Sequence, residues 1–269
     1  MPSLLRRSYR ALKRVIHPSL RYAQNVYEDV LGEYAKAGAR WLDVGCGHHI
    51  LPEWRGDSEQ QLVARCAVVV GVDADTQALS KHRSIHMRAA AKLPDLPFRP
   101  DSFDLVTANM VVEHLATPAA DFASMARILA PGGYLILHTP NALGHATIGA
   151  RLVPEPFKKR LVHLLDGRVA DDVYPTFYRA NTPRRIRACA SAVRLEVERI
   201  ALIGSDAVTA LVPPLAMLEL LWIRLVSLRA LAPFRSNMIA ILRKPDAGED
   251  GFRPKAARAS ETSAREVSA

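Results

Sequence analysis

The most informative part of the chain reads Trp41-Leu42-Asp43-Val44-Gly45-Cys46-Gly47-His48-His49, an apolar run that ends in two glycines. Such a run is typical of a strand buried on both faces of a parallel sheet. The glycines carry no side chain that would keep a ligand away from the backbone. Residues 41–49 therefore predict a buried strand followed by a ligand-binding turn.

The turn lacks the features that bind a pyrophosphate. The dinucleotide fingerprint G-x-G-x-x-G needs a third glycine at position 50, where this chain has Ile50, and no G-K-[ST] follows. A second apolar run, residues 68–72, ends in Asp73. A carboxylate at that position can accept hydrogen bonds from two ribose hydroxyls. The pattern therefore indicates a nucleoside without a pyrophosphate and disfavours a nicotinamide-dependent oxidoreductase.

Strand-like apolar runs alternate with helical segments from Arg40 to Lys244, which is typical of a parallel sheet covered by helices on both faces. The expected strands are Arg40–Val44, Ala67–Val72, Phe103–Asn109, Tyr134–His138, Glu196–Ile203 and Asn237–Leu242. The expected helices include Ala119–Leu129, ended by Pro131-Gly132-Gly133, and Pro183–Ser191, with Thr182 as its N-cap.

Composition excludes several classes of protein. The chain has 269 residues, of which 49% are hydrophobic and 23% charged, so a folded α/β domain is expected rather than a disordered or fibrous chain. Its three cysteines form no C-x-x-C pair, which argues against a disulfide framework or a cysteine zinc site and favours a reducing compartment. His48 and His49 are adjacent, but no metal-ligand spacing surrounds them, so no metal is expected.

The net charge of +9 is concentrated at one end of the chain. Residues 1–27 contain no Asp or Glu, and they hold six basic residues: Arg6, Arg7, Arg10, Lys13, Arg14 and Arg21. A helix there would place Leu4, Leu5, Leu12, Val15 and Ile16 near one face. This pattern favours an anionic membrane surface or a solvated arm over nucleic acid. The alternative is that this helix packs against the domain. A mitochondrial transit peptide has similar chemistry and is not excluded by the sequence, whereas a secretory signal is not expected.

Four further motifs follow the glycine turn and Asp73 in order. They are Leu96-Pro97-Phe98, Asp101-Ser102-Phe103-Asp104-Leu105-Val106, Val112-Glu113-His114-Leu115, and the run from Leu129 through Pro131-Gly132-Gly133 to Asn141. Together they resemble the class I S-adenosylmethionine-dependent methyltransferases, and within them the group similar to the ubiquinone/menaquinone-biosynthesis methyltransferases. The resemblance covers about residues 40 to 142. It implies a Rossmann-like fold with a seven-stranded, mostly parallel sheet and helices on both faces.

The resemblance also implies a cofactor, S-adenosyl-L-methionine, and residues that bind it. Asp43, Gly45, Cys46 and Gly47 would line its methionine part, Asp73 and Ala74 would hold the ribose, and Leu93 would flank adenine, with Asn109, Met110 and Val111 under the sulfonium. Tyr22, Asn25 and Tyr27 are expected to close the pocket. Lys92 stands where the family often has an acid that contacts the adenine amino group, so a catalytically silent cofactor-binding protein is kept as the alternative.

His114 is the expected catalytic residue, because the resemblance places it at the methyl end of the cofactor and an imidazole is suited to take a proton at neutral pH. An ordering role for the loop is the alternative. The acceptor is expected to contact Tyr174, Tyr178, Arg179 and Asn141, whereas ordinary loop packing is the alternative for residues 171–183. His138 is expected to be buried and structural.

An apolar helical insertion is expected at about residues 207–234, where the family usually has a short hairpin. Three charged residues, Glu219, Arg224 and Arg229, argue against a spanning helix, and so does a break expected at Pro213-Pro214. An interfacial helix, a lid over an apolar acceptor and a homodimer contact remain open. The domain organisation expected is a basic N-terminal segment (1–30), a methyltransferase domain (31–245) and a disordered tail (246–269). The expected function is methylation of a small molecule, lipid-linked or a cell-envelope glycan precursor, in the cytoplasm or peripherally on the membrane.

Overall fold

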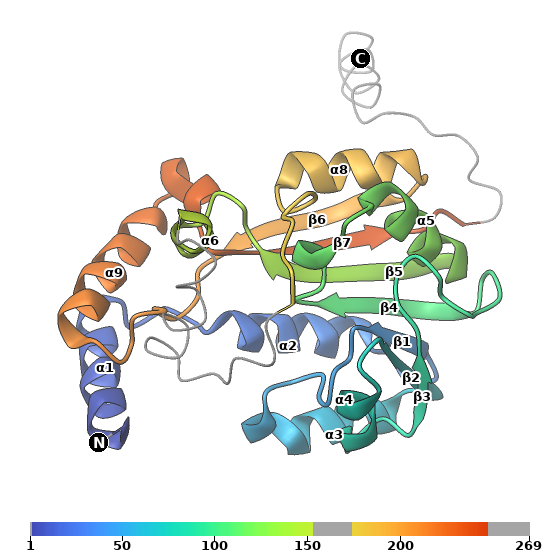
Figure 1. Cartoon of the computed structure of the whole chain (residues 1–269), viewed down its shortest axis with the longest axis horizontal. Helices are drawn as coiled ribbons and strands as arrows, with labels where there is room; N and C mark the ends of the chain where they lie inside the picture. Colours follow the sequence, from blue (N-terminus) through green and yellow to red (C-terminus); the bar gives the residue numbers. More distant parts are fainter. Residues whose placement is uncertain (1, 153–173, 247–269) are drawn as a thin grey trace, which may run out of the picture.

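The computed structural model, which describes residues 2–152 and 174–246, contains a seven-stranded sheet in the order β3-β2-β1-β4-β5-β7-β6 (Figure 1). The strands are β1 Arg40–Val44, β2 Val68–Asp73, β3 Met87–Ala90, β4 Phe103–Asn109, β5 Leu129–Pro140, β6 Glu196–Ile203 and β7 Asn237–Arg243. The strands from β3 to β5 pair in parallel, and β7 is antiparallel to both β5 and β6. This order brings the carboxyl ends of β1, β2 and β4 to one edge, where open α/β sheets bind ligands.

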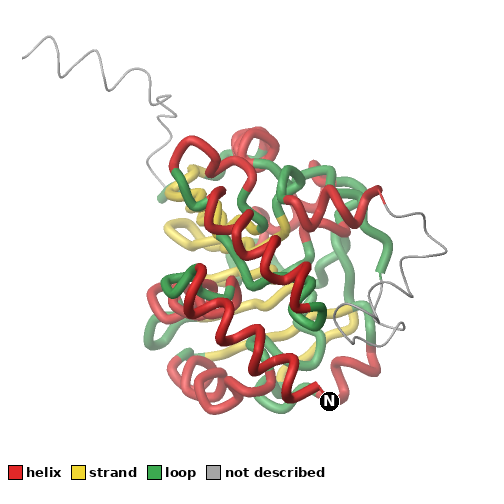
Figure 2. Tube along the Cα trace, turned by 90° about the vertical axis from the view of Figure 1, so that its left-hand side faces the viewer, coloured by secondary structure: helices red, strands yellow, loops and turns green. Residues whose placement is uncertain are grey.

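Helices cover both faces of the sheet (Figures 1 and 2). The helices are α1 Pro2–Ile16, α2 Ala23–Tyr34, α3 Gly56–Arg65, α4 Thr76–Lys81, α5 Pro118–Ile128, α6 His145–Leu152, α8 Pro183–Ala192 and α9 Pro213–Val226, with short 3-10 turns at Glu53–Arg55, Val112–His114 and Arg229–Phe234. One core cluster joins the sheet to α5 and α8, and a second joins the opposite face to α2 and α3. Leu42 belongs to the first and Trp41 to the second, as successive residues of a strand require.

The predicted strands are confirmed, with two differences. β3 was not among them, because this short edge strand is mostly exposed and lacks an apolar run. Helix α5 ends at Ile128, and Leu129–Gly133 belongs to β5, not to the end of the helix. The reason is long-range pairing: the Gly132 N–H donates to the carbonyl of Lys244, whose own N–H donates to Gly133.

Helices α1 and α9 pack side by side at one end of the molecule, at the front of Figure 2. Pro213 and Pro214 occupy the first turn of α9, where a missing N–H costs nothing, so they begin the helix instead of breaking it. Leu12 and Ile16 face the α9 contact as expected, but Val15 does not, because 83% of it is exposed. The tail beyond Asp246, the side chain of Leu4 and residues 171–173 lie outside the described residues.

Candidate active site

The turn after β1 is joined to the tip of β2 by a direct hydrogen bond. The Gly47 N–H donates to Oδ2 of Asp73 over 2.9 Å, and Oδ1 of Asp73 accepts from the N–H of Asp75 over 2.9 Å. Gly45 and Gly47 have φ values of +67° and +53°. A Cβ at Gly45 would come within 2.5 Å of Val111 Cγ2, whereas a Cβ at Gly47 would meet no atom within 4 Å. The turn is therefore packed on one side and open on the other, next to a half-buried carboxylate.

Asp43 lies on β1 under this turn and is almost fully buried, with 2% of the residue exposed. Its Oδ1 accepts from the Thr107 hydroxyl over 2.5 Å, and that hydroxyl oxygen accepts from the indole N–H of Trp41 over 2.8 Å. Burial raises the pKa of Asp43 to about 7, and the Thr107 hydrogen bond offsets only part of that rise. A carboxyl group of this kind can change protonation state near neutral pH.

Asn109, at the end of β4, is held by one side chain from α2 and one from β5. Its Nδ2 donates to Gln24 Oε1 on α2 over 3.1 Å, and its Oδ1 lies 2.8 Å from Nδ1 of His138 on β5. The ring of His138 stacks on that of Tyr27 with centroids 5.3 Å apart. Burial lowers the pKa of His138 to about 4, so the imidazole is neutral and donates from Nδ1. The amide orientation of Asn109 is thereby fixed, and α2 covers the end of β4.

Glu113 and His114 follow β4 and hold the segment that begins at residue 174. The Glu113 carbonyl accepts from the N–H groups of Phe177 and Tyr178 at 2.7 and 3.1 Å. His114 Nδ1 lies 2.7 Å from the carbonyl oxygen of Pro175. Because a carbonyl only accepts, Nδ1 carries the proton of the neutral ring, and the lone pair is on Nε2, which lies 4.0 Å from Glu113 Oε1. The side chain of His114 is 31% exposed, so a small molecule can approach it.

A buried hydrogen-bond chain supports this segment from below. The Glu113 carboxylate accepts from the Thr139 hydroxyl over 2.9 Å, and the hydroxyl oxygen accepts from Asn181 Nδ2 over 2.6 Å. Burial raises the pKa of Glu113. The sequence motifs include Glu113 and Thr139 but do not show this contact, which links residues far apart in the chain.

The expected acceptor contacts differ in how they are placed. Tyr174 is 52% exposed, its hydroxyl donates to Asp75 Oδ2 over 3.3 Å, and its ring contacts that of His114 edge-on. Tyr178 lies beside Arg151, and the Arg179 guanidinium donates to the carbonyl of Ala116. Among the expected acceptor contacts, Tyr174 is thus the one that touches both His114 and Asp75, the residue just before α4.

Asn141 is a correction to the expected acceptor contacts. It is fully buried, and its Nδ2 donates to the carbonyls of Pro233 and Arg235 while its Oδ1 accepts from the N–H of Leu143. The amide is saturated by backbone partners, so Asn141 braces the loop before β7 rather than facing a ligand.

The remaining expected cofactor residues differ in how far they are buried. Cys46 is buried, with its thiol against Gly71, and burial raises its pKa, so it is inert. Ala74 and Lys92 are exposed, Leu93 packs on the core, and Met110 is 37% exposed with φ +58°. Within residues 2–152 and 174–246, no group of three His, Cys, Asp or Glu side chains could hold a metal ion.

Two residues of the turn's surroundings were not singled out in the sequence. Glu59 on α3 is buried, and its Oε2 accepts from the N–H groups of Ile50 and Leu51 at 2.9 and 2.8 Å. Gln24 reaches Asn109 from α2. Glu59 could have been found from the sequence, because it is a carboxylate on the helix that follows a glycine-rich turn. No pattern near Gln24 in the sequence indicates that it contacts Asn109.

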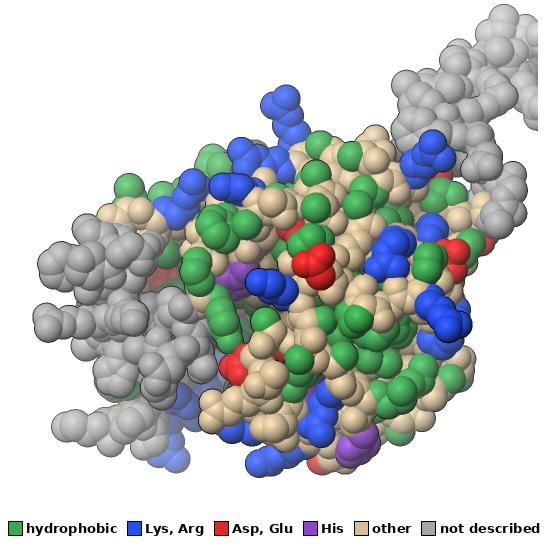
Figure 3. All heavy atoms as spheres, turned by 45° about the vertical axis from the view of Figure 1, so that its right-hand side comes forward, with side chains coloured by type: hydrophobic (Ala, Val, Ile, Leu, Met, Phe, Trp, Pro, Cys, Tyr) green, Lys and Arg blue, Asp and Glu red, His purple; other side chains and the backbone are tan. Residues whose placement is uncertain are grey.

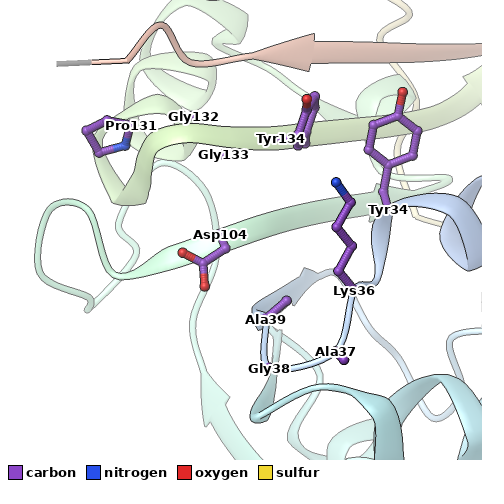
Figure 4. Close-up of a pocket in the computed structure, with 10 residues that line it drawn as sticks. All are labelled: Tyr34, Lys36, Ala37, Gly38, Ala39, Asp104, Pro131, Gly132, Gly133 and Tyr134. Carbon is purple, nitrogen blue, oxygen red and sulfur yellow. The ribbon is translucent and has the colours of Figure 1, made fainter. Parts of the chain in front are cut away.

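A shallow cavity of about 370 Å³ lies at the opposite edge of the sheet (Figure 4). It is lined by Tyr34, Lys36, Ala37, Gly38, Ala39, Asp104, Pro131, Gly132, Gly133 and Tyr134. These residues lie at the amino-terminal ends of β1 and β4 and near the start of β5. None of the expected site residues lines this cavity, and it is separate from the turn at residues 45–49.

Comparison with known proteins places the chain in a family. Residues 18–172 match the family described as a methyltransferase domain, which is more than half of the chain, so the protein belongs to that family. Membership confirms the family predicted from the sequence, and the seven-stranded sheet with helices on both faces confirms the predicted fold (Figure 1).

Similar curated proteins are called ubiquinone biosynthesis O-methyltransferase. The one from Xanthomonas oryzae pv. oryzae (strain PXO99A) is 32% identical over 142 residues, which are 48% of this chain and 56% of the relative. The one from Paracidovorax citrulli is 34% identical over 131 residues, or 43% of this chain and 51% of the relative. The chain thus spans about half the length of these relatives.

Solved structures share the fold at low sequence identity. An S-adenosylmethionine-dependent methyltransferase from Mesorhizobium loti has a TM-score of 0.52 and 15% identity, covering 82% of this chain and 98% of that one. A SAM-dependent methyltransferase from Methanosarcina mazei has a TM-score of 0.54 and 14% identity, with coverage of 81% and 98%. These likenesses concern the fold.

Proposed function

We propose that the protein transfers a methyl group from S-adenosylmethionine to a small-molecule acceptor. The observation that carries this proposal is the hydrogen bond between the open glycine turn and the carboxylate of Asp73 at the ends of β1 and β2. It sets an acid that can hold ribose hydroxyls beside a backbone that a ligand can approach.

The residues present fit the methionine and ribose parts of this cofactor. Gly47 faces open space, and an ionised carboxylate has about four acceptor positions, so Asp73 can accept from two hydroxyls while keeping its two backbone partners. At the adenine edge the fit is weaker, because exposed Lys92 replaces the acid that the family often has there. Backbone groups near Leu93 would have to make that contact.

When bound, the cofactor would supply an activated methyl group, which an acceptor takes in an in-line displacement with the neutral thioether, S-adenosylhomocysteine, as the leaving group. The protein's own task is to align the acceptor and exclude water. Asn109, fixed by Gln24 and His138, lies at the end of β4, where the resemblance places the sulfonium. The segment from residue 174 is hydrogen-bonded to Glu113, which follows β4, and is suited to cover an acceptor.

His114 is proposed as the base that takes the proton of an acceptor hydroxyl. The Pro175 carbonyl fixes the proton on Nδ1, so the lone pair lies on Nε2, and the ring is partly accessible. We expect His114→Gln to lower the rate by about 100-fold while the affinity for S-adenosylhomocysteine stays that of the wild type. An equal loss of cofactor affinity would assign His114 to loop ordering.

The proposed acceptor is lipid-linked or a cell-envelope glycan precursor. The name of the curated relatives supports oxygen as the atom methylated and an apolar substrate. A prenylated phenol is therefore the first probe. Peripheral association with an anionic membrane and a location in the cytoplasm are part of the same proposal, and a homodimer is the alternative to membrane association. Among the described residues, no helix is long and apolar enough to cross a membrane.

Calorimetric titration with S-adenosylhomocysteine tests the cofactor site. Asp73→Ala and the milder Asp73→Asn should each weaken binding at least about tenfold, because a charge-assisted hydrogen bond is worth about 1.5–3 kcal/mol. Asp57→Asn, at an exposed carboxylate of α3, is the matched control and should bind like the wild type. Binding of NADH instead, or no loss in either Asp73 variant, would contradict the proposal. Cofactor binding without turnover of any acceptor would favour a silent binding protein.

A further inference from the structure

Helix α9 carries an apolar face that no other described element covers. Its exposed apolar side chains, with those of the turn after it, are Leu215, Leu218, Leu221, Trp222, Leu225 and Leu228. Leu218 is 60% exposed and Leu221 48% exposed. Positions 218, 221, 222 and 225 recur at helical spacing, so they form one stripe. This outer stripe of α9 is a contiguous apolar surface, which is unusual for a face in water.

Packing inside the molecule uses a different face of the same helix. Ala216, Leu220 and Ile223 are buried in a cluster with Tyr9 of α1 and Leu20. Glu219, the acid of α9, is turned inward and accepts hydrogen bonds from His145 and from both the N–H and the hydroxyl of Thr209. The helix is therefore apolar on two sides, and its inner contacts do not account for the outer stripe.

Helix α1, which packs beside α9, has basic side chains and no acidic ones. Arg6, Arg7, Arg10 and Arg14 of α1 are exposed, and α1 contains no Asp or Glu. Arg224 and Arg229 add two exposed basic residues at the end of α9. By contrast, the face shown in Figure 3 mixes apolar side chains with both basic and acidic ones. The exposed apolar and basic groups thus belong to α1, α9 and the turn after α9, and these two helices lie side by side (Figures 1 and 2).

We infer that the outer stripe of α9 and the arginines of α1 form a docking surface for an anionic lipid bilayer. Apolar side chains of an interfacial helix enter the boundary between headgroups and acyl chains, while arginines bind anionic headgroups. A helix of 14 residues is about 21 Å long, shorter than the roughly 30 Å hydrocarbon core, so α9 lies along the surface. A second copy of the chain fits less well, since it would bring two sets of arginines together.

The docking surface is tied to the cofactor side of the molecule by short connections. Arg224 donates to the carbonyl of Ile16, and α1 is followed after six residues by α2, whose Gln24 contacts Asn109. Glu219 joins α9 to α6 through His145 over 2.8 Å. A bilayer on this surface would therefore hold the domain in a fixed orientation, which suits an acceptor that resides in the membrane.

Vesicle flotation of the full chain tests the inference without any need for activity. Vesicles of equal parts phosphatidylcholine and phosphatidylglycerol should carry the protein, and phosphatidylcholine alone should carry much less. Leu218→Gln with Leu221→Gln should weaken binding about tenfold or more, and so should Arg7→Gln with Arg14→Gln. The matched controls are Met87→Gln, at an apolar side chain that is 58% exposed on β3, and Arg184→Gln with Arg187→Gln on α8, and both should bind like the wild type.

Trp222 gives a second readout. Brominated acyl chains should quench part of the tryptophan fluorescence, and Trp222→Phe should remove that part. Absence of binding to anionic vesicles, or equal loss in the α8 control, would overturn the inference. Concentration-dependent dimers that disappear in the Leu218→Gln, Leu221→Gln variant, without vesicle binding, would identify a second copy as the occupant. Titration with S-adenosylhomocysteine in the same variants tests the proposed function separately, because they leave the cofactor residues unchanged.

Discussion

Replacement of Asp43 by asparagine should change how stability depends on pH. Asp43 is buried, and its pKa in the folded protein is about 7 against an ordinary value of 3.8. Because this acid has a raised pKa when folded, the folded state binds the proton more tightly than the unfolded state. Stability is therefore lost as pH rises from about 4 to about 7 and stays low above that.

The size of the effect follows from the two pKa values. Each pH unit between them costs about 1.4 kcal/mol, so the full penalty of ionising Asp43 is about 4 kcal/mol. About 2.5 kcal/mol of it falls between pH 5 and pH 8. Asparagine keeps an oxygen that accepts from the Thr107 hydroxyl but cannot ionise. The unfolding free energy of Asp43→Asn relative to the wild type should thus rise by about that amount over this range.

Urea unfolding followed by circular dichroism at about pH 5 and about pH 8 measures the difference. Other groups with shifted pKa values, such as His138, are present in both proteins and cancel in the comparison. A difference between variant and wild type that does not change with pH would refute the reasoning, because Asp43 would then titrate as an ordinary carboxyl group.

Three further predictions concern the turn and the insertion. Gly45→Ala should lower the free energy of unfolding by about 1–3 kcal/mol, because the new Cβ would lie 2.5 Å from Val111 Cγ2. Gly47→Ala should lower it less, because a Cβ there meets no atom within 4 Å. Equal losses in urea unfolding would contradict this difference. Glu59→Gln should lower the free energy of unfolding by about 1–3 kcal/mol and weaken S-adenosylhomocysteine binding in calorimetry. The reason is that the Glu59 carboxylate accepts hydrogen bonds from the N–H groups of Ile50 and Leu51. Unchanged affinity would show that Glu59 has a structural role only. Glu219→Gln should speed amide exchange at residues 208 and 209 without changing cofactor affinity, and unchanged exchange would show that this carboxylate does not hold the segment.

Local patterns were sufficient for much of the fold. Apolar runs located β1, β2 and β4, with glycine after β1 and an acid at the end of β2, and Thr182 before Pro183 located the start of α8. These signals are short-range, because burial on both faces and capping depend on residues adjacent in the chain. The glycine turn and Asp73 could be paired from the sequence alone, because parallel strands bring their carboxyl ends to one edge.

The environment of each site residue was decided by the tertiary structure. The sequence could not show that Asn141 is saturated by Pro233 and Arg235, or that Pro175 fixes the proton of His114, because these partners lie some 60 to 94 residues away. Val15 faces solvent because α9 packs on a different side of α1. The sequence by itself determined which residues form the strands and the cofactor turn, since those depend on neighbours in the chain. Protonation, side-chain orientation and exposure depend on long-range packing, so only the folded structure decided them.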